Sequence, residues 1–266
     1  MKIAEASITV AIAGQPNVGK TSVYNMLTGQ SEYVSNWPGK TYEHKTGKYQ
    51  KNGISLQIVD LPGAYSLTAN SEEERAARDY LITRNPDVVV AVVDAVSLER
   101  NLYMVAELLC LPIPIVLALN MIDIAGNEGI HVEPHVLEAA LGIPVIPMIA
   151  SRGQGGSELV EAVIRTAKDP GSFSPNRPVI QADHIPVLTI IESLITTYVP
   201  SPYPPCWVAT KLLEGDEEIT QMMRLQLGDT WEKVHQILLH HDDAFLAVAS
   251  GRYEWIARMV RAAVVR

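Results

Sequence analysis

The sequence is poor in cysteine and in positive charge. Its 266 residues include two cysteines, Cys110 and Cys206, which lie far apart and lack C-x-x-C spacing. This pattern favours reduced thiols over a disulfide framework. Lysine and arginine number 21 against 30 acidic residues, for a net charge of −9. Such a balance argues against a protein that binds the nucleic-acid backbone, because those contacts need clustered positive charge.

Long apolar runs are also missing. A transmembrane helix needs about 18 or more uncharged apolar residues. The two most apolar stretches, 88–96 and 113–122, are shorter than that. The N-terminal stretch "MKIAEASITVAIAG" is interrupted by Glu5 and runs directly into a glycine-rich segment, so it predicts a strand rather than a signal peptide. We therefore expect this piece to be soluble and not to cross a membrane.

Runs of β-branched residues alternate with helical patterns along the first part of the chain. These runs predict buried strands at 8–13, 54–59, 88–93, 115–119 and 143–149. Their nearly continuous hydrophobicity is typical of a mostly parallel α/β sheet that is covered by helices on both faces. Asp60, Asp94 and Asn120 each follow such a run. Ligands bind beyond the carboxyl ends of strands in these sheets, so a site is expected there.

The pattern changes after residue 170. Residues 171–183 are rich in proline, glycine, serine and asparagine, which predicts a linker between a first domain, 1–170, and a second domain, 184–266. The second domain has helical periodicity and no convincing strand. Its predicted helices are 185–198, 207–214, 217–227, 229–239 and 243–265.

The segment Gly14–Thr21, "GQPNVGKT", is a complete G-x-x-x-x-G-K-[ST] motif between a predicted strand and a predicted helix. Its glycines let backbone N–H groups turn around an anion at the positive end of the helix dipole. Lys20 can then reach the β- and γ-phosphates, and Thr21 can ligate magnesium. The motif predicts a triphosphate-binding loop.

Two later motifs indicate which triphosphate is bound. In "DLPG", Asp60 can hold the magnesium shell, and the amide of Gly63 can face a γ-phosphate. In "NMID", the carboxylate of Asp123 can accept hydrogen bonds from N1–H and N2–H₂ of guanine, an edge that adenine lacks. A wrong base would leave buried polar groups unpaired, so the order and spacing of these motifs predict guanine recognition.

At residue level, the chain resembles the FeoB family of ferrous iron transporters, within the translation-factor-like GTPases. The similar segments are "GQPNVGKTS", "VSNWPGKTYEHKTG", "DLPGAYSL", "VVDAVSLERNLY", "ALNMIDIA" and "PPCWVATKLLEGD". The resemblance implies a Ras-like P-loop GTPase domain with a mostly parallel six-stranded sheet. A small all-helical, GDI-like domain would follow it and lead to a transmembrane region that is absent here.

The resemblance also implies roles for individual residues. Thr41 matches the switch-I threonine that closes over magnesium and the γ-phosphate. Asn17 matches the asparagine of potassium-activated members, in which switch-I carbonyls near Ser35 to Trp37 complete the potassium shell. Ser35 stands where the family usually has glycine.

The expected site has three overlapping sets of residues. Catalysis is assigned to Asn17, Lys20, Thr41 and Gly63. The magnesium ligands are Thr21, Thr41 and Asp60, the last directly or through water, and the potassium ligand is Asn17. The nucleotide-binding set comprises Gly14, Gln15, Pro16, Asn17, Val18, Gly19, Lys20, Thr21, Ser22, Asp60, Gly63, Asn120, Met121, Asp123, Ala150 and Ser151.

Two departures from the wider GTPase pattern affect the expected chemistry. Ala64 stands where Ras-type proteins carry the glutamine that orients water, so intrinsic hydrolysis is expected to be slow. Met121 replaces the usual lysine of N-K-x-D, so packing against the base would be apolar.

The motifs predict a magnesium-dependent GTPase, and the resemblance implies that it is potassium-activated and regulates ferrous iron uptake at the cytoplasmic face of the bacterial inner membrane. Its expected partners are GTP or GDP, its own transmembrane domain and small accessory Feo proteins, with no nucleic acid. A soluble GTPase that acts on ribosomal or transfer RNA is the alternative, although the acidic charge opposes it. A metabolic P-loop kinase is a third hypothesis, and a preference for ATP would favour it.

One further segment, "HHDDAF" at 240–245, contains imidazole and carboxylate groups that suit iron(II). Adjacent histidines do not easily point at one ion. The favoured interpretation is therefore a solvated turn in which Asp242 or Asp243 caps the next helix.

Overall fold

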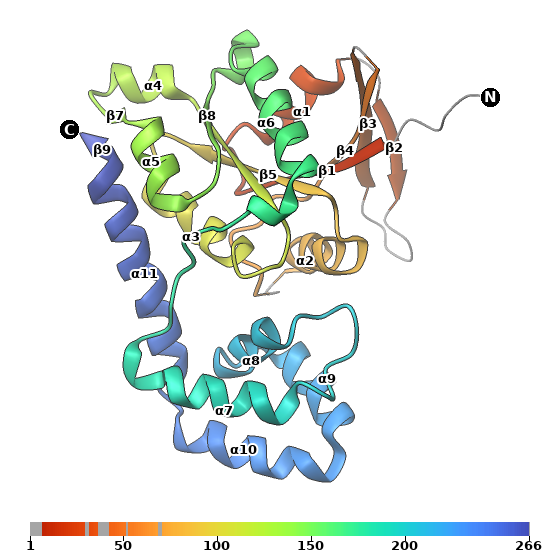
Figure 1. Ribbon diagram of the computed structural model, residues 1–266, viewed down its shortest axis with the longest axis vertical. Helices are drawn as coiled ribbons and strands as arrows, with labels where there is room; N and C mark the ends of the chain where they lie inside the picture. Colours follow the sequence, from red (N-terminus) through yellow and green to blue (C-terminus); the bar gives the residue numbers. More distant parts are fainter. Residues whose placement is uncertain (1–6, 30–31, 37–42, 52, 69–70, 266) are drawn as a thin grey trace.

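The computed structural model describes residues 7–29, 32–36, 43–51, 53–68 and 71–265, and Thr41 and Trp37 lie outside these ranges. Figure 1 shows a sheet with flanking helices in its upper half and a group of helices in its lower half. This architecture confirms the expected α/β domain with a mostly parallel sheet and an additional helical unit. The predicted boundaries at 170 and 184 stay a prediction.

The sheet has seven strands in the order β2-β3-β4-β1-β5-β6-β8. Its strands are β1 (Ser7–Gly14), β2 (Glu32–Asn36), β3 (Glu43–Lys51), β4 (Ile54–Asp60), β5 (Val88–Asp94), β6 (Ile115–Asn120) and β8 (Val145–Pro147). The five strands from β4 to β8 are parallel, whereas β2 and β3 pair antiparallel at one edge. The expected count of six was therefore wrong by one edge strand.

Helices cover both faces of this sheet. In the sheet domain they are α1 (Lys20–Thr28), α2 (Glu72–Arg84), α3 (Leu98–Leu108), α4 (Ile122–Asn127), α5 (Pro134–Leu141) and α6 (Gly156–Lys168). Successive residues of β1 point to opposite faces: Val10 and Ile12 pack toward α1 and α6, and Ala11 and Ala13 pack toward α2 and α3. Burial on both faces explains the continuous apolar runs in the sequence.

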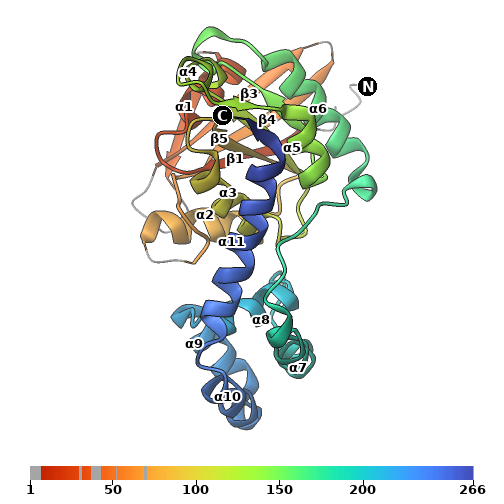
Figure 2. The same cartoon turned by 90° about the vertical axis from the view of Figure 1, so that its left-hand side faces the viewer.

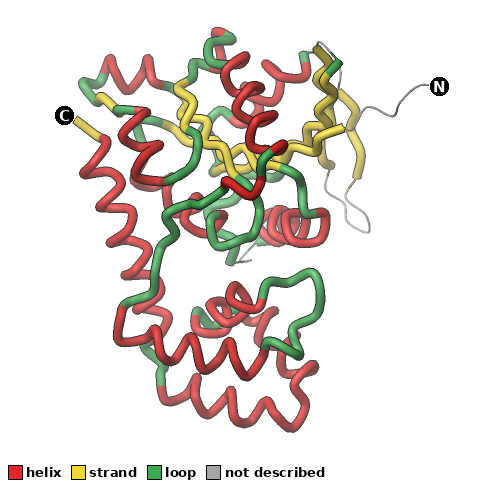
Figure 3. The backbone as a smooth tube through the Cα atoms, in the orientation of Figure 1, coloured by secondary structure: helices red, strands yellow, loops and turns green. Residues whose placement is uncertain are grey.

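The lower unit is built from helices, as Figure 3 shows by its red segments. They are α7 (Ile185–Ile195), α8 (Pro205–Leu213), α9 (Glu217–Leu227), α10 (Trp231–His240) and α11 (Ala244–Ala263). Short 3-10 turns accompany the helices of the two units at Ala150–Arg152, Pro170–Ser172, Ala182–His184 and Gly228–Thr230. Trp207 and Trp255 are buried in a core that is continuous with the α2/α3 face of the sheet.

The longest of these helices, α11, returns to the sheet domain. It packs against α3 and α5 and runs along the molecule from the lower unit to the upper one, as Figure 2 shows. At its end, β9 (Val264–Val265) pairs antiparallel with β7 (His131–Val132). The expectation that the second unit has no strand was therefore wrong for these two residues, which form a two-stranded antiparallel pair with the segment after α4.

Among the helices that the structure describes, none combines the length and the apolar character that a membrane span requires.

Candidate functional site

The phosphate-binding motif forms the turn between β1 and α1. Gly19 has φ 87° and Asn17 has φ 68°, so the loop passes twice through the left-handed region. A Cβ atom on Gly19 would clash with Nδ2 of Asn120, and one on Gly14 would lie 2.5 Å from the carbonyl oxygen of Val92. Close packing therefore requires both glycines, and the left-handed backbone at Gly19 is a second reason for glycine there.

Lys20 joins this loop to the "DLPG" segment. Its Nζ donates to Oδ1 of Asp60 and to the carbonyl oxygen of Leu61, both at 2.7 Å. The amide of Ala64 donates to the carbonyl oxygen of Gly14 at 3.2 Å. The structure therefore brings Lys20 and Asp60 together at the end of β1 and β4. Thr21 lies exposed in the first turn of α1 beside them.

Gly63 lies directly against the phosphate-binding loop. A Cβ atom at this position would be 3.3 Å from the backbone nitrogen of Pro16 and 3.2 Å from its Cγ. The side chain of Ser22 is partly exposed on α1, and Val18 is buried under the loop. Gly63, the predicted γ-phosphate contact, therefore lies next to the phosphate-binding loop.

Asn120 braces the loops around the site. It is 3% exposed, its Nδ2 donates to the carbonyl oxygen of Val18, and its Oδ1 accepts from the amide of Ala150, both at 3.0 Å. Its side chain thus ties the phosphate-binding loop to the loop after β8. The amide of Ala150 is thereby engaged within the protein, and the role of Asn120 in nucleotide binding stays a prediction.

Asp123 follows at the start of α4. Its carboxylate is about one-quarter exposed, and its Oδ2 lies 3.5 Å from Nη2 of Arg152, which stands next to the exposed Ser151. Met121 precedes it with φ 62° and directs the chain into α4. Arg152 therefore neighbours the predicted base-reading carboxylate of Asp123, although Arg152 itself is not in the predicted nucleotide-binding set.

Gln15 is turned away from the loop's outer surface. It is 3% exposed, its Nε2 donates to the carbonyl oxygen of Arg100 at 2.8 Å, and its Oε1 accepts from Asn101 at 3.1 Å. Both partners lie on α3. Only the main chain of Gln15 is left to contribute to the predicted nucleotide contact.

The segment that follows "DLPG" is held by carboxylates from two helices. Oε1 of Glu74, on α2, accepts from the amides of Tyr65 and Ser66 at 3.1 and 3.3 Å. Oε2 of Glu107, on α3, accepts from the amide of Leu67 at 2.5 Å. Sequence reasoning missed these carboxylates, because nothing in the local pattern separates them from solvated helical acids.

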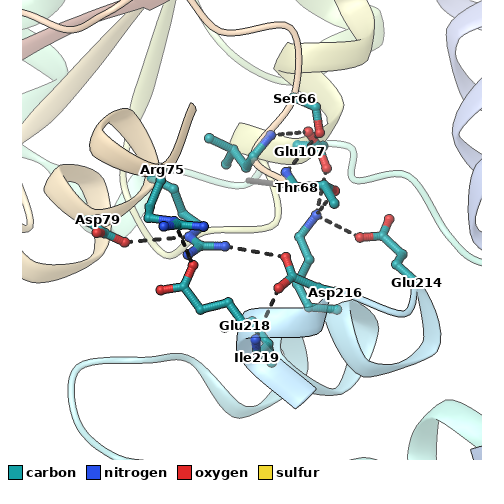
Figure 4. A network of polar contacts seen from close by, with 12 residues as sticks. Ser66, Thr68, Arg75, Asp79, Glu107, Glu214, Asp216, Glu218 and Ile219 are labelled. Atoms are coloured by element: carbon teal, nitrogen blue, oxygen red, sulfur yellow. Dashed lines mark hydrogen bonds and ion pairs between the residues drawn. The ribbon is translucent and has the colours of Figure 1, made fainter. Parts of the chain in front are cut away.

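A buried charge cluster connects this segment to the helical unit (Figure 4). Nζ of Lys211, on α8, contacts Oγ1 of Thr68 at 2.7 Å, Oε1 of Glu107 at 2.8 Å and Oε2 of Glu214 at 2.6 Å. Lys211 and Glu107 are each 1% exposed. Arg252, on α11, pairs with Glu107 at 3.4 Å and also with Glu214. Three helices and the segment that follows "DLPG" therefore meet at buried charges of both signs.

A second set of ion pairs lies beside the first. Arg78, on α2, has a fully buried side chain, and its guanidinium contacts Asp216 at 3.3 Å and Glu218 at 2.6 Å. Arg75 reaches the same Glu218 at 3.0 Å. Asp216 also caps α9 by accepting from the amide of Ile219. The helix that follows the "DLPG" segment is therefore docked onto the helical unit (Figure 4).

Acid pH should weaken this connection through Glu107. Burial alone would raise the pKa of its carboxyl group, but the positive charges of Lys211 and Arg252 outweigh burial and lower the pKa to about 2. A folded-state pKa below the unfolded value of 4.5 adds stability above pH 4.5, which is lost as the pH falls toward 2. We expect the unfolding free energy from urea titrations to fall by up to about 1.4 kcal/mol per pH unit in that window.

The variant Glu107→Gln isolates this contribution from that of other carboxyl groups. Its unfolding free energy should be lower than that of the wild type at pH 7, and the difference between the two proteins should shrink between pH 4.5 and 3. A difference that stays constant over this range would contradict the assignment.

Comparison with known proteins gives a consistent result over both units. The family model described as Ferrous iron transport protein B matches residues 8–163, and that of the FeoB cytosolic helical domain matches residues 186–265. The chain is 37% identical over 262 residues to the Fe(2+) transporter FeoB of Escherichia coli K12. This match covers 94% of the chain and 32% of the relative. The chain therefore spans about a third of the length of that curated relative.

Solved structures resemble both units together. A GDP-bound mutant of S. thermophilus NFeoB has a TM-score of 0.86 at 32% identity, with 97% of this chain and 100% of that chain covered. The cytosolic domain of the T. maritima FeoB iron transporter in its GMPPNP form has a TM-score of 0.81 at 31% identity, with the same coverage. The cytosolic domain of L. pneumophila FeoB has a TM-score of 0.84 at 30% identity, again with 97% and 100% covered.

Proposed function

Because the chain belongs to the FeoB family, we propose that it binds GTP, hydrolyses it to GDP and phosphate, and thereby regulates ferrous iron uptake across the bacterial inner membrane. The observation that carries this proposal is the meeting of Lys20, Asp60 and Gly63 at the N-terminus of α1, where backbone amides and the helix dipole favour an anion. Relatives bound to GDP and GMPPNP support the choice of ligand.

Asp123 is the proposed reader of the guanine base. Its carboxylate lies at the start of α4 and is partly open to solvent, so it can accept the two N–H groups of the guanine edge. Asn120 holds the phosphate-binding loop and the loop after β8 at fixed positions around it. Since the amide of Ala150 donates to Asn120, we assign the contact with the base oxygen to the neighbouring Ser151.

The donors around Lys20 suit magnesium. Hydroxyl and carboxylate oxygens are the ligands that Mg²⁺ prefers, and the exposed Thr21 and the carboxylate of Asp60 lie on the two sides of the phosphate-binding turn. Thr21 and Asp60 would hold the ion, together with Thr41 by family resemblance. When bound, magnesium offsets negative charge on the β- and γ-phosphates.

The protein's own groups supply the remaining steps. Lys20 exchanges its contacts with Asp60 and Leu61 for phosphate oxygens and neutralises them. The amide of Gly63 senses the γ-phosphate, and the loss of that group releases Thr41 and the "DLPG" segment. The side chain of Ala64 is buried and carries no polar group, so it cannot orient water as a glutamine does, and we expect slow intrinsic turnover.

Asn17 is the proposed ligand of an activating potassium ion. Its side chain is exposed at the apex of the phosphate-binding loop, and its amide oxygen is a suitable donor for a hard cation. GTP hydrolysis should be faster in potassium than in sodium buffer for the wild type, and this difference should vanish in Asn17→Ala. Phosphate release measured for both proteins in both salts, with GDP affinity as the control, tests this. Equal rates in all four conditions would remove Asn17 from the mechanism.

The proposed partners are the transmembrane region of the longer protein and small accessory Feo proteins, and the proposed location is the cytoplasmic face of the inner membrane. The ion pairs of Lys211 and Arg78 join the segments next to the proposed nucleotide site to the helical unit, so a change at the site can reach that unit. Family membership and the net charge of −9 favour this function over a GTPase that acts on RNA or a metabolic kinase.

A further inference from the structure

Three potential metal ligands meet at the base of the helical unit, far from the phosphate-binding loop in the sequence. His184 ends the 3-10 turn before α7, and His241 and Asp243 belong to the turn between α10 and α11. One ligand atom from each residue lies within 4.8 Å of the others. Two imidazoles and one carboxylate within this distance are a donor set that binds first-row transition metals.

The side chain of His184 is positioned for this role. The residue is 8% exposed, and its Nε2 lies 3.2 Å from Oδ1 of Asp243. The ring of His241 stands edge-on to it, with a centroid distance of 5.9 Å and an angle of 76°. Nε2 of His184 therefore faces the carboxylate that a bound cation would share with it.

Each ring nitrogen of His184 lies close to a carboxylate. Nε2 is hydrogen-bonded to Asp243, whereas Nδ1 lies 3.0 Å from Oδ1 of Asp183 without a hydrogen bond. Two carboxylates beside one imidazole favour the binding of a cation here.

The backbone around the cluster is fixed by contacts between the two segments. The amide of His184 donates to the carbonyl oxygen of Gln181 at 3.0 Å, and the amide of Gln181 donates to that of Ala247, on α11, at 3.3 Å. The amide of Ala244 donates to the carbonyl oxygen of His241 at 3.0 Å. The ligands therefore come from segments that already pack together, which lowers the entropic cost of assembling a site.

The structure separates the two histidines of "HHDDAF". Nδ1 of His240 lies 2.6 Å from the carbonyl oxygen of Gln236, so this ring is held along α10. The partner of His241 is instead His184, from 57 positions earlier in the chain. The sequence argument concerned two adjacent histidines, whereas this cluster draws its second imidazole from a distant part of the chain.

We propose that His184, His241 and Asp243 bind one divalent transition-metal ion, with zinc(II) and iron(II) as the ions that the donors suit best and water in the remaining positions. The ion would fasten the start of α7 to the start of α11, the helix that contacts α3 and α5 of the sheet domain. This site is independent of the nucleotide proposal, since it shares no residue with the phosphate-binding loop.

A competition titration tests the site directly. The chelator-treated chain, in excess Mg²⁺, is titrated with Zn²⁺ against a chromogenic chelator, and in parallel with Co²⁺, whose visible spectrum reports imidazole coordination. Anaerobic Fe²⁺ in a third titration distinguishes the two candidate ions. The wild type should bind one ion per chain.

Variants separate the site from adventitious binding. His184→Ala and His241→Ala should weaken Zn²⁺ binding by about 100-fold or more, since even the loss of an outer-shell partner costs about 10- to 100-fold. His240→Ala is the matched control and should bind as the wild type does. Asp243→Asn alters an exposed side chain, so it tests a ligand with little risk to folding, which circular dichroism checks.

Two results would overturn the proposal. The first is a wild-type chain that binds none of Zn²⁺, Co²⁺ and Fe²⁺ tightly at one ion per chain. The second is an equal loss of affinity in His240→Ala and His241→Ala, which would show that the ion binds to surface histidines of α10 rather than to the cluster with His184.

Discussion

Lys211→Met should lower the free energy of unfolding by roughly 3–5 kcal/mol, because it leaves a buried carboxylate without its closest positive charge. Lys211 and Glu107 are each 1% exposed and lie 2.8 Å apart, so water cannot replace the lost contact. Arg252 alone would then face Glu107 and Glu214. The expected fall in melting temperature is roughly 6–20 °C, measured by calorimetry.

Two further variants make this prediction specific. Lys233→Met removes an exposed lysine of α10 and should leave the melting temperature nearly unchanged. Glu107→Gln keeps an acceptor for the amide of Leu67. The double variant with Lys211→Met should lose less unfolding free energy than the sum of the losses in the two single variants. Strict additivity would mean that the two side chains do not stabilise each other.

Asp123→Asn should lower the affinity for GDP by roughly 100-fold or more, because an amide presents a donor toward a base edge that also donates. The same change should raise the affinity for xanthosine diphosphate, since xanthine carries a carbonyl oxygen at C2 where guanine has an amino group. The reversal distinguishes base reading from a general loss of structure. Competition against a fluorescent nucleotide measures both affinities.

The control for this variant is Asp229→Asn, which removes a carboxylate of the same kind from an exposed 3-10 turn in the helical unit. It should bind GDP as the wild type does. If Asp123→Asn lost affinity for both diphosphates equally, or for neither, the base-reading role of Asp123 would be wrong.

The sequence predicted the central strands well because each is buried on both faces. The runs at 54–59, 88–93 and 115–119 each differ from the observed strand by one residue at the carboxyl end. The run at 143–149 was too long, because only Val145–Pro147 pairs with β6. The antiparallel strand β3, "EHKTGKYQK", is mostly polar, so hydrophobic periodicity gave no sign of it.

The site was predictable where the motif itself fixes the geometry. The motifs assigned Lys20 and Asp60 to one site, and the structure places Nζ of Lys20 2.7 Å from Oδ1 of Asp60. The side-chain contacts of Gln15 and Asn120 were harder to predict, because their hydrogen-bond partners lie far away in the sequence. Buried charges such as Lys211 were missed for a similar reason: charged residues are assumed to be solvated until their distant partners are known.

The most direct test of the account is a calorimetric titration of the purified chain with GDP and with ADP in the presence of magnesium. The account predicts one GDP bound per chain, displaced by GTP, and far weaker binding of ADP, because Asp123 accepts from an edge that only guanine has. No detectable heat at saturating GDP, or equal binding of ADP and GDP, would contradict it.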